Sequence, residues 1–178
     1  MFVLIKSANT MNTSEILNKT LAWLYIKEQE VPGNLWDITG YLDSIGEQHQ
    51  SDVIGLELAE RGYLRTYYRY ENQNSFNAAI NTIGMQQVAP EEVFTLTQIV
   101  LNMLNCEPLK FHDISELPGL ESKEWLQLVE FTRYLLKQGW IEAKVLNDKL
   151  LIKLTIEGRL YLKNYEFIAW YSKYILPL

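Results

Sequence analysis

One stretch of the chain, from Gly139 to Lys163, constrains the fold more than any other. Gly139 suits the left-handed backbone conformation that closes a helix, and Asn147-Asp148 suits a tight turn between two apolar runs. Thr155 is placed to cap the next helix, whose positively polarised first turn then holds Glu157. The stretch therefore predicts a helix end, a two-stranded hairpin and a new helix start, in that order.

This order of elements resembles the second half of a winged helix-turn-helix domain. The sequence LTIEGRLYL, from Leu154 to Leu162, is similar to the stretch that follows the wing in many winged-helix transcriptional regulators. The resemblance implies three helices followed by a hairpin that forms the wing. It also implies sequence-specific DNA binding, which is an argument by analogy with the fold.

The same order of elements is predicted twice along the chain, which indicates an internal repeat. Residues 58–64, LAERGYL, align with residues 135–141, LLKQGWI, at an offset of 77. Thr82-Ile83 aligns with Thr155-Ile156 at an offset of 73, so the first hairpin is expected to be four residues longer. We therefore expect an α+β, mainly helical protein with two tandem winged-helix domains and a long C-terminal helix. The expected segments are an N-terminal arm at 1–12, a first domain at 13–89, a second domain at 90–163 and a C-terminal extension at 164–178.

Apolar spacing and cap residues predict the elements of each domain. The first domain is expected to hold helices at 12–29, 35–44 and 51–61 and strands at 63–70 and 76–83. The second is expected to hold a helix at 91–105, a short strand at 109–112, a very short helix from Asp113, a third helix from Ser122 with Trp125 in its buried stripe, and a hairpin at 140–154.

Composition limits the classes of function. The chain is 48% hydrophobic, but its longest apolar run is far below the roughly 20 residues that a membrane span requires, so we expect no membrane association and a cytoplasmic location. Cys106 is the only cysteine, and neither His49 nor His112 has a second histidine or a cysteine at ligand spacing. No phosphate-binding loop or nucleophile motif is present. We therefore expect no metal, no cofactor and no catalytic residue.

The charge distribution points to the second hairpin as the place where phosphate would bind. The net charge of −6 argues against non-specific coating of nucleic acid, yet residues 137–173 hold 7 basic side chains against 4 acidic ones. In DNA-binding winged helices the third helix enters the major groove and the wing meets the backbone. By that resemblance, the candidate nucleic-acid-binding residues of the second domain are Ser122, Lys123, Gln127, Arg133, Lys144, Lys149 and Lys153.

The first hairpin offers a second candidate surface. In the sequence RTYYRY, alternation with period two places Arg65, Tyr67 and Arg69 on one face of a strand. Such a face can grip phosphates and stack on bases, and it can equally be a solvated sheet face with arginine stems lying across tyrosine rings. The third helix of this domain is a poor DNA-reading surface, because Asp52, Glu57 and Glu60 would face phosphates.

The final helix is expected to run from Ile156 to about Leu176, roughly 30 Å, which is longer than a domain of this size needs. It either packs between the two domains or pairs with its copy in a homodimer, and both readings stay open. The residues expected to contact a copy or a partner protein are Phe167, Trp170, Tyr171, Tyr174 and Ile175.

Two functions follow from these expectations. The first is a transcriptional regulator that binds double-stranded DNA. The alternative is a non-catalytic scaffold that binds a partner protein, as in the resemblance to the tandem winged-helix accessory subunits of chromosome-condensing complexes. Analogy with the fold ranks the DNA-binding regulator slightly first, the acidic balance of the chain favours the scaffold and places it close behind, and an enzyme is the least favoured class.

Overall fold

The computed structural model describes residues 12–70 and 75–174, and it describes the side chains of these residues except Tyr70 and 166–174. The protein is α+β and mainly helical, and it divides into two compact units, Met1–Ile80 and Asn81–Leu178. The expected boundary lay between residues 89 and 90 instead. It shifts because helix α4, Thr82–Val88, packs against helices α5 and α6 of the second unit. Residues 1–11 of the expected N-terminal arm lie outside the described part.

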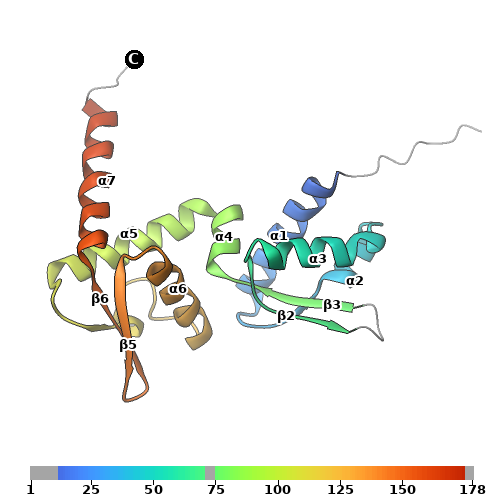
Figure 1. The fold of residues 1–178 in the computed structure, drawn as a ribbon, viewed down its shortest axis with the longest axis horizontal. Coiled ribbons are helices and arrows are strands. Elements are labelled where there is room, and N and C mark those ends of the chain that lie inside the picture. Colours follow the sequence, from blue (N-terminus) through green and yellow to red (C-terminus); the bar gives the residue numbers. More distant parts are fainter. Residues whose placement is uncertain (1–11, 71–74, 175–178) are drawn as a thin grey trace, which may run out of the picture. The chain divides into compact units, whose positions relative to one another are not determined.

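The first unit is a three-stranded antiparallel sheet, in the order β1-β3-β2, packed against three helices (Figure 1). Its second helix begins at Ile38 and not at the expected residue 35, because Trp36 and Asp37 pair with β3 as a short strand. The second strand of the hairpin ends at Ile80, where the chain turns into α4. The elements are α1 (Thr13–Glu30), β1 (Trp36–Asp37), α2 (Ile38–Ser44), η1 (Gln48–Gln50), α3 (Ser51–Glu60), β2 (Leu64–Tyr70) and β3 (Ser75–Ile80).

From α5 onward the second unit has a similar order around a sheet with strands in the order β4-β6-β5, with the 3-10 helix η2 where the first unit has α2 and η1. Its third helix begins at Trp125 and not at Ser122, which lies in the turn before it. Trp125 itself is exposed, so its expected place in the buried stripe is wrong. The elements are α4 (Thr82–Val88), α5 (Pro90–Cys106), β4 (His112–Asp113), η2 (Ile114–Glu116), α6 (Trp125–Lys137), β5 (Ile141–Leu146), β6 (Lys149–Leu154) and α7 (Ile156–Tyr174).

The local signals in the stretch 139–163 are confirmed. Gly139 has a φ of 76°, and Asn147 and Asp148 have φ values of 49° and 59°, as a two-residue turn with both central residues in the left-handed region requires. Thr155 Oγ1 accepts a hydrogen bond from the N–H of Gly158 at 3.0 Å, which caps α7. These local bonds fix where the hairpin starts and ends.

Each unit has its own core, and equivalent positions of the repeat are buried in both. Leu58 of α3 and Leu135 of α6 are fully buried, and each is worth about 1.5–3 kcal/mol on removal from water. Gly62 and Gly139 close these two helices with φ values of 70° and 76°. The expected repeat around the third helix and its closing glycine therefore has a structural counterpart.

The caps of the helices that follow the hairpins show a different register. Asn81 accepts a hydrogen bond from the N–H of Gly84, just as Thr155 accepts one from Gly158. These caps align Asn81 with Thr155, an offset of 74 and not the expected 73.

None of the helices within residues 12–70 and 75–174 is long and apolar enough to cross a membrane.

Candidate nucleic-acid interface

The outer face of the second hairpin holds the three lysines that were expected to meet phosphate. Antiparallel partners share a face of the sheet, and Glu142 lies opposite Lys153 while Leu146 lies opposite Lys149. Lys153 Nζ is 2.8 Å from Glu142 Oε2. Lys144, two residues after Glu142 on the same strand, has the same orientation.

Strand β4 and the following 3-10 helix η2 each add a carboxylate to this face. Lys149 Nζ lies 2.9 Å from Asp113 Oδ2 and 3.2 Å from Glu116 Oε1. These hydrogen bonds, the one to Asp113 foremost, raise the pKa of Lys149. Burial would raise the pKa of Asp113, but hydrogen bonds from Lys149 and Ser115 outweigh it and lower that pKa. Both groups are therefore held in their charged forms.

A phenylalanine lies beneath the remaining positive charge. Lys144 Nζ is 4.0 Å and Lys153 Nζ 5.1 Å from the centroid of the Phe111 ring, within the range of a cation–π contact. Glu142, Asp113 and Glu116 supply three negative charges against the three positive charges of Lys144, Lys149 and Lys153, a balance of zero. The expected basic hairpin is electrically neutral on this face.

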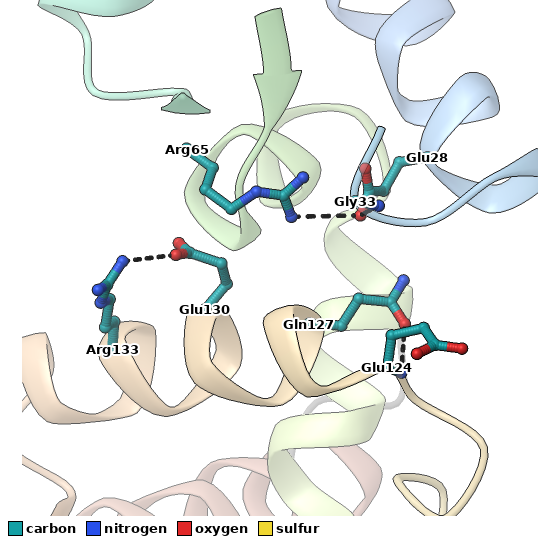
Figure 2. Close-up of polar contacts among 7 residues, drawn as sticks. All are labelled: Glu28, Gly33, Arg65, Glu124, Gln127, Glu130 and Arg133. Carbon is teal, nitrogen blue, oxygen red and sulfur yellow. Dashed lines mark hydrogen bonds and ion pairs between the residues drawn. The ribbon is translucent and has the colours of Figure 1, made fainter. Parts of the chain in front are cut away.

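The α6 candidates are also used within the protein. Gln127 Oε1 accepts a hydrogen bond from the N–H of Glu124 at 3.2 Å, which holds the first turn of the helix (Figure 2). Arg133 has an exposed side chain, but its Nη1 lies 2.7 Å from Glu130 Oε1. Ser122 and Lys123 precede the helix and are not part of it. The candidate reading helix therefore offers little unpaired positive charge.

The first hairpin does not present the expected face to solvent, because Arg65 is buried against Glu28 of α1. The register between β2 and β3 shifts between Leu64 and Thr66, so Arg65 is an extra residue in the strand. Arg65 turns inward, its Nη1 3.4 Å from Glu28 Oε1, and the two side chains are only 7% and 1% exposed (Figure 2). The predicted exposed position of Arg65 is wrong.

Tyr67 and Arg69 do share a face, on the side of the sheet where α3 lies, and both side chains stay about half exposed. Tyr67 stacks on Phe76 with ring centroids 5.6 Å apart, and Phe76 is buried. Arg69 Nη2 lies 2.6 Å from Asp52 Oδ2 of α3. The guanidinium thus neutralises one of the carboxylates that made α3 a poor surface for DNA.

Sequence reasoning missed the residues that neutralise these cations. Glu28 lies 37 positions from Arg65 and Asp113 lies 36 from Lys149, so no local spacing signals either pair. Two apolar residues at the hairpin tip were also missed, although Val145 is 65% and Leu146 51% exposed. The signal for them was present in the sequence, because both directly precede the predicted turn.

The remaining candidate features are a small cavity and the last helix. The cavity, of about 160 Å³, lies between the start of α4 and α6 and is smaller than most small-molecule sites. Within the described residues no three histidine, cysteine, aspartate or glutamate side chains gather where they could hold a metal ion. The side chains of Phe167, Trp170, Tyr171 and Tyr174, and the whole of Ile175, lie outside the described part.

No protein family, curated protein or solved structure matches this chain.

Proposed function

We propose that the chain is a non-catalytic protein-binding module built from two winged-helix domains, and that the β5–β6 hairpin is a docking element for a partner protein. The winged-helix assignment is supported by the order of elements in each unit and by the matching strand orders β1-β3-β2 and β4-β6-β5. The protein-binding function rests on the chemistry of the second hairpin.

The observation that carries the proposal is the contrast between the stem and the tip of that hairpin. In the stem, Lys149 and Lys153 are held by carboxylates of the protein itself, so little charge is left for phosphate. At the tip, Val145 and Leu146 are exposed on opposite faces of β5. Burial of these side chains in a partner's pocket would contribute about 1.5–3 kcal/mol each. A neutral stem with an apolar tip suits a protein groove better than a DNA backbone.

The hairpin is also held in one conformation before it binds. The six paired positions from Ile141↔Leu154 to Leu146↔Lys149 form a continuous ladder that ends in the two-residue turn. Phe111 and the ion pairs with β4 brace its outer face. A preorganised hairpin loses less conformational entropy on binding, which strengthens association without further contacts.

The test combines a partner assay with a DNA assay. A tagged chain is purified from its own cells, the co-purifying protein is identified, and its binding is then measured with both components pure. We expect Val145→Asp with Leu146→Asp to abolish that binding, because two charges would enter an apolar pocket. Leu109→Asp is the matched control, since Leu109 is 88% exposed and lies outside the hairpin. Equal binding by the hairpin variant and the control would contradict the proposal.

DNA binding is the second candidate, and one observation favours it. Among the described residues, neither Lys123 nor Lys144 has a carboxylate oxygen within 4.0 Å. If this face binds a duplex, Lys144→Glu, Lys149→Glu and Lys153→Glu together should abolish binding and flatten its salt dependence. Lys19→Glu on α1 is the control. No change in a gel-shift titration would discard DNA binding for this face.

A further inference from the structure

Within the second unit, helix α4 contacts helix α6. The repeat gives each chain a second pair of equivalent helices, α7 and α3, that could make the same contact between two copies. The start of α4 packs on α6, where Glu130, Arg133, Tyr134 and Lys137 line the small cavity with Asn81, Thr82 and Ile83. Helices α4 and α7 are equivalent, because each follows a hairpin and begins with the same cap bond to a glycine. Helices α3 and α6 are equivalent through their closing glycines.

The α3 residues that correspond to the cavity-lining residues of α6 form a surface with exposed apolar side chains. At the offset of 77, the four α6 positions correspond to Val53, Leu56, Glu57 and Glu60. Val53 is 57% and Leu56 42% exposed. The four residues are spaced i, i+3, i+4 and i+7, so they form one stripe along the helix. This stripe, the α3 stripe, is apolar in its first half and acidic in its second.

Helix α7 carries a complementary stripe. At the offset of 74, Thr82 and Gln86 of α4 correspond to Ile156 and Leu160. Thr82 is buried in α4, whereas Ile156 is 72% and Leu160 54% exposed. With Arg159 and Lys163, both exposed, they repeat the spacing i, i+3, i+4 and i+7. This α7 stripe therefore holds two apolar and two basic side chains, against the two apolar and two acidic ones of α3.

We propose that α7 of one copy of the chain docks on the α3 stripe of a second copy, as α4 docks on α6 within one chain. Ile156 and Leu160 then bury against Val53 and Leu56, which are about half exposed in the single chain. The basic residues of α7 face the acidic end of α3, where Glu60 is exposed and Glu57 is paired with Arg61 at 2.7 Å.

The geometry of this contact differs from that of a symmetric dimer. Each copy contributes one α7 stripe and one α3 stripe, so the interface is head-to-tail and both ends of an assembled pair remain open. Self-association should therefore proceed beyond the dimer as concentration rises. The docking element of the proposed function, the β5–β6 hairpin, is not part of this interface.

Sedimentation equilibrium on the purified full chain tests the proposal with two single variants. Leu56→Glu removes the α3 stripe and leaves α7 intact, and Leu160→Glu does the reverse. Each variant alone should associate about tenfold or more weakly than the parent, because a charge would enter the apolar contact. Mixed in equal amounts they should form a 1:1 dimer and nothing larger, because one intact interface remains. Leu109→Glu should assemble like the parent.

Each alternative occupant gives a result that overturns the proposal. If Leu160→Glu no longer associates while Leu56→Glu associates like the parent, α7 pairs with α7 of the second copy. A parent chain that stays monomeric would mean that neither stripe binds a second copy. If a leucine variant fails to fold by circular dichroism, an equal mixture of Glu60→Lys and Lys163→Glu replaces it. In Glu60→Lys alone two lysines meet at the interface, and in Lys163→Glu alone two glutamates meet, whereas mixing the two variants restores opposite charges. The proposal fails if the mixture associates no better than either variant alone.

The experiment is separate from the test of the proposed function. It uses no DNA and no partner protein, so a monomeric result leaves the hairpin proposal unaffected. Conversely, Val145→Asp with Leu146→Asp is expected to leave self-association unchanged, whether or not the hairpin binds a partner.

Discussion

Removal of one member of the buried ion pair between α1 and β2 should destabilise the first unit severely. Glu28 Oε1 accepts hydrogen bonds from the N–H of Gly33 at 3.0 Å and from Arg65 Nη1 at 3.4 Å. The side chains are 1% and 7% exposed, so neither charge is solvated by bulk water. Arg65→Met would leave the carboxylate buried without its counter-charge, and Glu28→Gln would do the same to the guanidinium.

The structure sets the magnitude. Loss of one partner from a buried pair typically costs about 3–5 kcal/mol. The lower end applies here, because 3.4 Å is long for a charge-assisted hydrogen bond and because Glu28 Oε2 and Arg65 Nη2 have no hydrogen-bond partner among the described residues. We therefore expect a loss of about 3 kcal/mol for each single variant.

The double variant separates charge burial from packing. Glu28→Gln with Arg65→Met removes both charges, keeps an amide oxygen for the N–H of Gly33 and keeps most of the side-chain volume. Its cost should be only about 1 kcal/mol, far below the sum of the two single costs of about 3 kcal/mol each, so the coupling between the two sites should be about 5 kcal/mol in a double-mutant cycle. Arg69→Met is the matched control, because the Arg69–Asp52 pair is half exposed and should contribute no more than about 1 kcal/mol.

Urea unfolding followed by circular dichroism measures the free energies. Because a chain of two units need not unfold in one step, hydrogen exchange on peptides from α1 and α6 assigns each change to its unit. The loss should appear in α1 and spare α6. Strictly additive costs, or single variants that lose under about 1 kcal/mol, would refute the view that Arg65 is a buried counter-charge and not a surface residue.

Three further outcomes are expected. Gly55→Ala should cost about 1–3 kcal/mol by urea unfolding, because its Cβ would lie 2.6 Å from the ring of buried Phe76; Phe76→Leu should relieve part of that cost. Thr155→Ala should cost about 1 kcal/mol and increase hydrogen exchange in the first turn of α7, since the cap bond is lost; unchanged exchange there would contradict the cap. The pKa of Asp113 is lowered in the folded protein, so its ionised form contributes stability that is present above the unfolded pKa and is lost as pH falls through the folded pKa. Acid titration of the parent should show this loss of stability. The loss should be absent in Asp113→Asn and reduced in Lys149→Ala.

The sequence by itself determined the features that depend on a few neighbouring residues. Gly139, the turn at Asn147-Asp148 and the cap at Thr155 were placed correctly, because each rests on the backbone preference or the local hydrogen bond of a single residue type. The order of helix, hairpin and helix in both halves followed from the same signals. A helix start was misplaced where more than one residue could serve as the cap. Helix α6 was expected to start at Ser122, but Glu124 occupies the cap position.

Only the tertiary structure decided which charges are available at the surface. Helix α1 packs where Arg65 meets Glu28 and buries the guanidinium, and β4 placed Asp113 beside Lys149. Period-two alternation predicts which side chains share a face, but it does not say which face the helices cover, and it contains no information on residues more than thirty positions away that pair with the strand. Charge counts along the chain therefore predicted a basic hairpin, whereas long-range pairing made it neutral, because an ion pair depends on distance in space and not on distance in sequence.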